Sequence, residues 1–471
     1  MKRPTAYKIA LFIVACLAAL AALCYFFPKE GVHVGSLELR FPTLSEVLGT
    51  PTEVRLDSIG GIDGIDTLDT LEVLDTIPEP EPIPAPQPKP QPKPQPKPRV
   101  VQALDIVPTP AVEELVLPQF LYLPQALAKA DSQAVRVVYY GDSQVEGDRM
   151  TMMVRRALQK RFGGGGVGLL PLHQTVASRT VVQSLYLDGV LQSASGGPKR
   201  YLAYGPKSAR RDTNIYGPMA QVTVLDERLA TWQATAPKKK MSDSYFNRVR
   251  VVADDSIEVS IDGARRIGRG FYAMPDSSTK VTVTLQGPGD VYGLALETDK
   301  GVTVDNIPMR GCAGTIFSSM DPTALRRYYR DTHTALIILQ YGGNVVPYTQ
   351  SIKQVTSYVS RVRQQILFLR RLAPEADIVF VGPSDMVDKE DGETRTHPAV
   401  AQIDARLQQM CAQEGVLYFS LFKAMGGAGA MKRWHMNGWA GSDLIHFTRQ
   451  GADKAGNLLA DWLIEQIETA Q

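Results

Sequence analysis

The residues that could perform covalent chemistry stand far apart in the chain. Ser143 closes the tripeptide Gly141-Asp142-Ser143, and His446 follows Asp443 by three residues. A serine hydroxyl becomes nucleophilic when a histidine takes its proton, and a carboxylate orients that histidine and stabilises its charged form. The pattern predicts Ser143 as nucleophile, His446 as general base and Asp443 as the orienting acid. The tripeptide alone is also compatible with an ordinary turn in which Ser143 caps a helix.

None of the other histidines has an aspartate three residues before it. They are His33, His173, His333, His397 and His435. His435 stands close to His446 in the sequence, together with Trp434 and Trp439, so we expect these three side chains to line a substrate cleft. For the two tryptophans, a position in the core is the alternative.

A tetrahedral intermediate of acyl transfer needs hydrogen-bond donors for its oxyanion. Gly342-Gly343-Asn344 follows a strand-like run, and the amide of Asn344 is a suitable donor. Gly311 also follows a strand-like run and could offer a backbone N–H. A serine on a tight turn that opens a helix presents its own N–H as well. The candidate donors are therefore Ser143, Gly311 and Asn344, with ordinary loop positions as the alternative for the last two.

The segments around these residues predict alternating strands and helices. Residues 135–140 form an apolar strand that ends at Gly141, and a helix with Asp148 as its N-cap should follow. Later elements are strands at 335–339, 377–381 and 416–419 and helices at 352–372, 399–413 and 451–467. Such alternation is typical of a parallel sheet covered by helices on both faces. Ser143 and Asn344 should then lie at the same edge of that sheet.

A different pattern separates the two parts of this α/β domain, which we place at 100–171 and 305–471. Residues 172–304 carry short alternating runs divided by turns such as Asp262-Gly263, which predicts an inserted antiparallel β-sandwich. Some aromatic side chains of this insert could stack on sugars, although the sandwich core or edge is the simpler position for each. They are Tyr186, Tyr201, Tyr204, Trp232 and Tyr245.

Residues 1–29 predict a membrane anchor. A positively charged start precedes an unbroken apolar run at 9–27, which as a helix would span about 28 Å. The positive flank predicts a single-pass protein of the cytoplasmic membrane whose remaining chain lies outside. A cleaved signal peptide or a lipoprotein at Cys24 is the alternative.

Residues 30–99 should be a tether. Its proline-rich part, 78–98, predicts a stiff polyproline II spacer of about 65 Å, with an SH3 ligand as the alternative.

Composition narrows the function further. The formal net charge is +2, and the short basic clusters Lys238-Lys239-Lys240 and Arg210-Arg211 are expected in solvated loops, so we expect no nucleic-acid partner. Of four cysteines, Cys312 and Cys411 belong to the folded part. Without a CxxC or Cys/His cluster, we expect no metal site and no cofactor. Two buried free thiols are expected, with a disulfide as the alternative.

The order Gly-Asp-Ser, Gly, Gly-x-Asn, Asp-x-x-His resembles the four blocks of the SGNH/GDSL hydrolase superfamily. The resemblance implies a flavodoxin-like three-layer α/β fold. The roles that it assigns are Ser143 as nucleophile, His446 and Asp443 as base and orienting acid, and Ser143 N–H, Gly311 and Asn344 as oxyanion donors. Gly314 or Gly147 is the alternative to Gly311. The chain departs from the family at Val345, where the third block often has aspartate.

A narrower resemblance includes Gly141-Asp142-Ser143-Gln144, the glycine-rich run 163–168 and the β-rich insert. These features are similar to the peptidoglycan O-acetylesterase branch, which carries a carbohydrate-binding-like β-sandwich after the first block. The resemblance implies an esterase that removes O-acetyl groups from a cell-envelope glycan, in the periplasm or outside the cell, through an acetyl-enzyme on Ser143. An O-acetyltransferase loaded by a membrane acetyl-donor protein would use the same acyl-enzyme. A non-catalytic glycan-binding envelope protein is the third alternative.

Overall fold

The structure is a computed structural model of the 471-residue chain. It describes residues 32–34, 37–39, 118–211, 216–236, 241–388 and 395–470. The chain divides into two compact units, residues 1–62 and 63–471. In the first unit, β1 (Val32–Val34) and β2 (Leu37–Leu39) form an antiparallel hairpin. The expected anchor at 9–27 and the proline-rich tract lie outside the described residues, and among the helices that are described none is long and apolar enough to cross a membrane.

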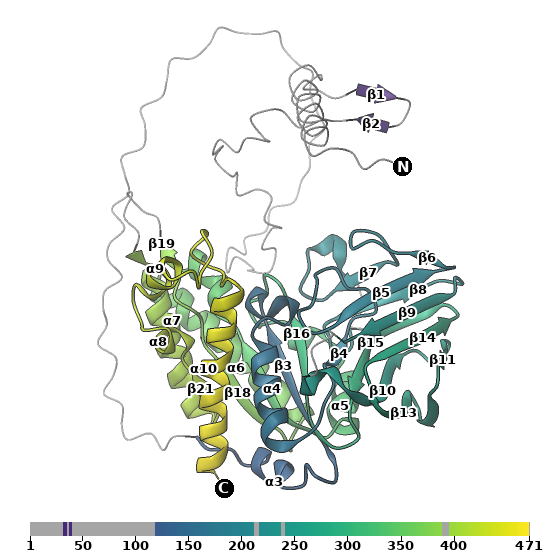
Figure 1. Ribbon diagram of the computed structural model, residues 1–471. Coiled ribbons are helices and arrows are strands. Elements are labelled where there is room, and N and C mark those ends of the chain that lie inside the picture. The colour runs from purple at the N-terminus through teal and green to yellow at the C-terminus, as the bar shows by residue number, and fades with distance from the viewer. Residues whose placement is uncertain are drawn as a thin grey trace, which may run out of the picture. The chain divides into compact units, whose positions relative to one another are not determined.

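Five parallel strands form the central sheet of the second unit, in the order β16-β3-β17-β18-β21 (Figure 1). The strands are β3 (Ala134–Gly141), β16 (Gly301–Pro308), β17 (Thr334–Gln340), β18 (Asp377–Val381) and β21 (Leu417–Phe419). In chain order the arrangement is 2-1-3-4-5, which is that of flavodoxin-like folds. The α/β fold with a parallel sheet is confirmed.

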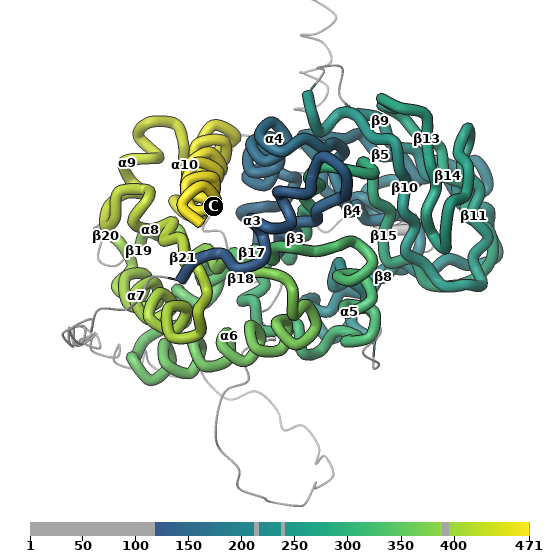
Figure 2. Tube along the Cα trace, turned by 90° about the horizontal axis from the view of Figure 1, so that it is seen from below, coloured from purple at the N-terminus to yellow at the C-terminus, as the bar shows by residue number. Residues whose placement is uncertain are grey.

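Helices cover both faces of this sheet, so the domain has three layers (Figure 2). One face carries α3 (Leu123–Leu127), α4 (Thr151–Phe162) and α10 (Arg449–Thr469), and the other carries α5 (Pro322–Asp331), α6 (Ile352–Leu372) and α7 (Pro398–Gln413). Two short helices, α8 (Leu421–Ala424) and α9 (Ala430–Met436), follow β21.

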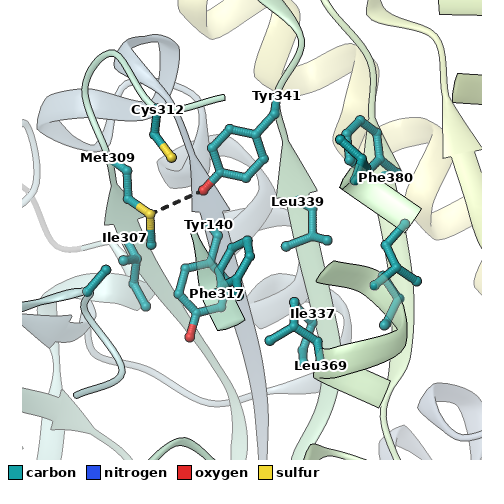
Figure 3. Close-up of a cluster of buried hydrophobic side chains, with 14 of the residues drawn as sticks. Tyr140, Ile307, Met309, Cys312, Phe317, Ile337, Leu339, Tyr341, Leu369 and Phe380 are labelled. Carbon is teal, nitrogen blue, oxygen red and sulfur yellow. Dashed lines mark hydrogen bonds between the residues drawn. The ribbon is translucent and has the colours of Figure 1, made fainter. Parts of the chain in front are cut away.

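Side chains of β3 alternate between the two cores, as a strand buried on both faces requires. Val137 and Tyr139 belong to the core under α4 and α10, and Val138 and Tyr140 to the core under α6 and α7. Figure 3 shows part of the second core, where the Tyr140 ring meets Phe317 edge-on with centroids 5.0 Å apart.

The region between β3 and β16 forms two packed antiparallel sheets, as the alternating pattern predicts. One has the order β12-β13-β10-β15-β8-β7, with β4 also paired to β15, and the other has the order β11-β14-β9-β5-β6. The strands are β4 (Gly168–Leu170), β5 (Val182–Leu187), β6 (Val190–Leu191), β7 (Arg200–Leu202), β8 (Gln221–Leu225), β9 (Ala230–Thr235), β10 (Phe246–Ala253), β11 (Glu258–Ile261), β12 (Arg265–Gly268), β13 (Phe271–Ser278), β14 (Lys280–Gln286) and β15 (Gly289–Glu297). The antiparallel region thus begins before the expected residue 172 and ends before residue 304, because 301–308 is the edge strand of the parallel sheet.

The two ends of this insert touch each other. Val302 N donates to Gly163 O over 2.9 Å, and a Cβ atom on Gly164 would collide with the backbone of Gly301 and Val302. Glycine permits this close approach of two backbones because it carries no side chain. The chain therefore enters and leaves the insert at the same place.

A buried ionic network connects the insert to the parallel sheet. Arg136 of β3 pairs with Glu297 of β15 and with Asp305 of β16, the latter over 2.7 Å, and Tyr328 Oη donates to Asp305 over 2.6 Å. Burial alone would raise the pKa of Glu297, but the charges of Arg136 and two further arginines lower it below its usual value. Both carboxylates are therefore compensated inside the interface, as buried charges must be.

The helix after Ser143 begins later than the sequence predicts. α4 starts at Thr151, and Asp148 is not its N-cap. Asp148 has a φ of 62° and accepts two hydrogen bonds from Arg155, at 2.5 and 3.0 Å, and one from Thr180. The carboxylate that could have capped the helix is used in a buried tertiary ion pair instead.

Candidate active site

The candidate nucleophile lies where the central strands of the parallel sheet end together. Gly141, the last residue of β3, is in register with the last residues of both neighbours, β16 and β17. The loops that carry Ser143, Gly311 and Asn344 therefore leave the same edge of the sheet. This is the edge at which α/β folds place their ligands.

A tight turn positions Ser143 directly after β3. The Oδ1 atom of Asp142 accepts a hydrogen bond from Gln144 N at 2.9 Å, which closes the turn across the serine. Arg149 Nη2 donates to the carbonyl oxygen of Ser143 from the other side. The serine is 8% exposed, so it is held in place but still reaches the surface.

The structure brings Ser143, His446 and Asp443 into one hydrogen-bonded chain. Ser143 Oγ lies 2.9 Å from His446 Nε2, although the two residues are 303 positions apart. His446 Nδ1 lies 2.8 Å from Asp443 Oδ2. A neutral imidazole that donates to the aspartate with one nitrogen can accept a proton from the serine with the other.

Asp443 fixes both the ring and the backbone of His446. Its Oδ1 atom accepts hydrogen bonds from Ile445 N and His446 N, each over 3.0 Å, while Oδ2 bonds the ring. Leu444 closes this turn with a left-handed φ of 57°. Partial burial raises the pKa of Asp443, but the hydrogen bonds from His446 and Ile445 outweigh that effect and lower the pKa below its usual value. The carboxylate stays charged, as an acid that stabilises an imidazolium must.

The amide of Asn344 lies next to the turn that carries the serine. Its Nδ2 atom donates to Asp142 Oδ2 over 3.2 Å and to Cys312 O over 3.0 Å. Burial raises the pKa of Asp142 to about 6, although the Gln144 N–H and the charge of His446 act in the opposite direction. Near neutral pH the carboxylate is therefore mostly ionised and orients the Asn344 amide.

Three glycines are candidates for the second backbone N–H that would donate to an oxyanion. Gly311 has a φ of 76°, is exposed, and has open space where a side chain would be. Gly314 packs against the Tyr341 ring, and its N–H is directed to the sulfur of Cys312 at 3.3 Å. Gly147 carries a φ of 67° beside the backbone oxygen of Ala177. Among these, Gly311 has the open surroundings that a free backbone N–H needs.

Two residues that the sequence analysis missed connect the nucleophile turn to the histidine loop. Gln144 Nε2 donates to Ile445 O over 2.8 Å, and its Oε1 accepts from Phe447 N over 3.5 Å. Arg149 Nη1 donates to Phe447 O over 3.4 Å. The only sequence signal was the position of Gln144 directly after the serine, because the partners of both side chains are backbone atoms.

The residues expected to line the cleft divide into two kinds. Trp434 is 3% exposed, donates from Nε1 to Met425 O, and packs on Phe447. The structure therefore corrects the expectation for Trp434, which is a core residue that packs against Phe447, the residue after His446. Trp439 is half-buried with Lys454 over its ring, and His435 is exposed. Both remain candidates for substrate contact.

Trp232, one of the aromatic residues considered for sugar stacking, is fully buried in the sandwich core. Cys312 and Cys411 are buried free thiols, as expected. In the ranges that the structure describes, no three histidine, cysteine or carboxylate side chains form a group that could hold a metal ion.

Comparisons with known proteins concern the family and the fold. Residues 276–454 match the GDSL-like lipase/acylhydrolase family, and no curated protein matches the chain. The structure of a peptidoglycan O-acetylesterase is similar over 74% of this chain and 95% of its own, with 20% identity and a TM-score of 0.60.

Two other solved structures are similar over smaller parts. The periplasmic domain of a lipopolysaccharide acetyltransferase from Salmonella ser. Paratyphi A is matched over 36% of this chain and 74% of its own, with 14% identity and a TM-score of 0.26. A catalytic mutant of an acetylxylan esterase from Geobacillus stearothermophilus is matched over 36% and 73%, with 15% identity and a TM-score of 0.25.

The family match over residues 276–454 and the fold together show that the chain contains a GDSL-like hydrolase domain. It is an ester-hydrolysing enzyme, and its fold resembles that of the peptidoglycan O-acetylesterase branch. The family match begins at residue 276, within β13 of the insert, and so includes Asn344, Asp443 and His446 but not Ser143.

Proposed function

We propose that the chain is a serine esterase that removes O-acetyl groups from a cell-envelope glycan. The observation that carries this proposal is the continuous chain from Ser143 Oγ through His446 to Asp443 at the end of β3. Ser143 is the nucleophile, His446 the general base and Asp443 the residue that orients and stabilises it.

In the first step, Ser143 Oγ attacks the acetyl carbonyl carbon as His446 Nε2 takes the serine proton. The tetrahedral intermediate collapses when its C–O bond to the sugar breaks and His446 returns the proton to the sugar oxygen. Water then attacks the acetyl-Ser143 carbonyl, giving one proton to His446. Collapse of this second intermediate releases acetic acid, which carries the second proton of the water and ionises in solution, and His446 reprotonates the serine.

The donors for the oxyanion are Ser143 N–H, Gly311 N–H and the amide of Asn344. Both protons of that amide are used in the free enzyme, one by Asp142 and one by Cys312 O. On this proposal, an incoming acetyl oxygen shares or replaces one of these bonds. Asp142 then keeps the amide plane aligned while the negative charge develops.

The choice of an acetylated envelope glycan is supported by the sandwich insert and by similarity of fold to a peptidoglycan O-acetylesterase. The apolar run at 9–27 and the proline-rich tract support a further part of the proposal, which is that the enzyme is anchored in the cytoplasmic membrane and acts on its outer side. Membrane fractionation of cells that produce the full chain tests the anchor, and recovery of intact chain in the soluble fraction would contradict it.

The decisive experiment incubates the full chain with O-acetylated peptidoglycan and an acceptor sugar, and measures free acetate and transferred acetyl separately. We expect free acetate from the wild type, none above background from Ser143→Ala, and unchanged release from the control Ser132→Ala, an exposed turn residue. Undiminished release by Ser143→Ala would refute the assignment of the nucleophile. Mainly transferred acetyl would make the enzyme an O-acetyltransferase.

A further inference from the structure

Two residues of the insert, Arg179 and Thr180, hold the loop that follows the nucleophile. Arg179 N donates to Gly147 O over 3.1 Å, and Arg179 Nη1 donates to Arg149 O over 3.3 Å. The hydroxyl of Thr180 donates to Asp148 Oδ2 over 2.5 Å. The insert therefore bonds three consecutive residues of a loop that belongs to the catalytic domain.

The same arginine pairs with the helix that follows the catalytic histidine. Arg179 Nη1 and Nη2 donate to Oδ1 and Oδ2 of Asp453 over 2.5 and 3.1 Å, and both side chains are partly buried. Asp453 lies near the start of α10, which begins at Arg449, three residues after His446. Because a bidentate pair fixes the relative orientation of its two members, Arg179 connects the nucleophile loop to the element that follows the loop of the base.

The side chain of Arg149 extends this connection to the reacting residues. Its Nη2 atom donates to Ser143 O, its Nη1 to Phe447 O over 3.4 Å, and its Nε to Glu146 O over 3.1 Å. A guanidinium group carries its donors in one rigid plane, so the three bonds depend on where the main chain places this residue. A contact that holds the main chain of Arg149 therefore also holds Ser143 relative to the loop of His446.

The charges around this connection need compensation. Partial burial lowers the pKa of Arg149, and the positive charges of Arg310 and Arg179 lower it further. The negative charge of Glu146 acts in the opposite direction. Repulsion between the guanidinium groups of Arg149 and Arg179 has to be offset, and Asp453 contributes to this by pairing with Arg179. Loss of either member of the pair therefore disturbs the surroundings of Arg149.

We propose that Arg179 is a positioning residue for the esterase reaction. Through Arg149 and Asp453 it holds the nucleophile at the distance from the general base that proton transfer requires. The inference rests on the proposed roles of Ser143 and His446 in catalysis. It gives the insert a part in the chemical step itself, so that hydrolysis of even a very small ester depends on a residue of the insert.

Steady-state hydrolysis of 4-nitrophenyl acetate by the full chain tests this proposal, because binding of a glycan plays no part in it. We expect Arg179→Gln and Asp453→Asn each to lower kcat about tenfold and to leave KM unchanged, since a small displacement between nucleophile and base affects the rate rather than binding. The double variant should be no slower than the slower single variant, because both changes break the same connection.

Arg228→Gln is the matched control. Arg228 also belongs to the insert and pairs with an aspartate, Asp226, over 2.7 Å, but this pair is exposed. We expect wild-type kcat and KM from this variant. Circular dichroism checks that each variant is folded, and Asp453→Asn, which keeps the shape of its side chain, carries the test if Arg179→Gln does not fold.

Hydrogen–deuterium exchange followed by mass spectrometry gives a second readout that needs no substrate. In Arg179→Gln we expect faster exchange in peptides that contain residues 143–149 and 443–449, and wild-type exchange in peptides of α6, because only the first two lose a support.

Wild-type kcat in folded Arg179→Gln and Asp453→Asn would overturn the proposal, and so would a raised KM with an unchanged kcat. An equal loss of kcat in Arg228→Gln would show that any lost charge in the insert has this effect, and would overturn it as well. If the wild type does not hydrolyse the ester, the esterase function is contradicted, whereas the exchange experiment still decides whether Arg179 holds the two loops.

Discussion

The side-chain amide of Gln144 bonds the main chain on both sides of His446, with Nε2 2.8 Å from Ile445 O and Oε1 3.5 Å from Phe447 N. The residue that follows the nucleophile therefore holds the loop of the base. This contact sets the position of the imidazole relative to Ser143 without touching either reacting atom. Gln144 is a positioning residue in this geometry.

Replacing Gln144 by leucine should lower kcat for 4-nitrophenyl acetate about tenfold or more, because small displacements of a general base have large effects on rate. Gln350→Leu, at an exposed position, is the control. The pH profile should keep its shape, since no titrating group is removed. A wild-type kcat in Gln144→Leu would show that the other contacts of the loop suffice.

Asp443→Asn should lower kcat by about 10²- to 10⁴-fold and leave the fold intact. Asparagine can still accept from the two backbone N–H groups of the turn, but its amide no longer stabilises a protonated ring. Stopped assays of acetate release measure the rate, and circular dichroism checks the fold. Activity within a factor of three of the wild type would remove Asp443 from the mechanism.

Asn344→Ala removes one proposed oxyanion donor and should lower kcat about 10²- to 10³-fold with little change in KM. An oxyanion donor acts on the transition state and so does not alter the binding of the ester in its ground state. The kinetics of a soluble acetyl ester provide the measurement. A raised KM with an unchanged kcat would indicate that Asn344 binds the substrate instead.

Asp142 should make the stability of the protein depend on pH. Its folded pKa of about 6 lies above the usual 3.8, so between these values the native state holds a proton that the unfolded state has released. Stability from this group is present at low pH and is lost as pH rises toward 6. Relative to Asp142→Asn, the wild type should lose at most about 3 kcal/mol of unfolding free energy between pH 4 and pH 7.5. Urea unfolding at both pH values measures the difference, and a pH-independent difference would refute the raised pKa.

Glu297→Gln should lower the free energy of unfolding by about 3 kcal/mol, because it leaves Arg136 with less compensating charge inside the protein. Glu258→Gln, at an exposed position of β11, should have almost no effect. Thermal or urea unfolding compares the two variants. Similar stability of both would mean that Asp305 alone compensates Arg136.

The sequence predicted those parts of the fold that depend on local pattern. The helix expected at 352–372 has the same ends in the structure, where Ser351 caps α6 and its apolar residues face one core. The nucleophile, the base and the orienting acid could also be expected, because their residue types and spacing carry the chemistry.

Other features depended on tertiary contacts that no local pattern encodes. Asp148 had the residue type of a helix cap but pairs with Arg155. Trp434 and Trp232 could have been in a cleft or in a core, and only packing decides between these positions. Gln144 bonds backbone atoms about 300 positions away, and every residue type offers the same backbone atoms.

The contact between Gly163 and Val302, where the insert begins and ends, has a consequence for how such enzymes can diversify. Because the two ends meet, the chain leaves and re-enters the parallel-sheet domain at one place, so the insert can change in length without changing the path of β3 and β16. An exchange of one sandwich for another at this junction must nevertheless supply a new carboxylate for Arg136, as Glu297 does here. The buried charge of Arg136 therefore limits which sandwiches this sheet can carry.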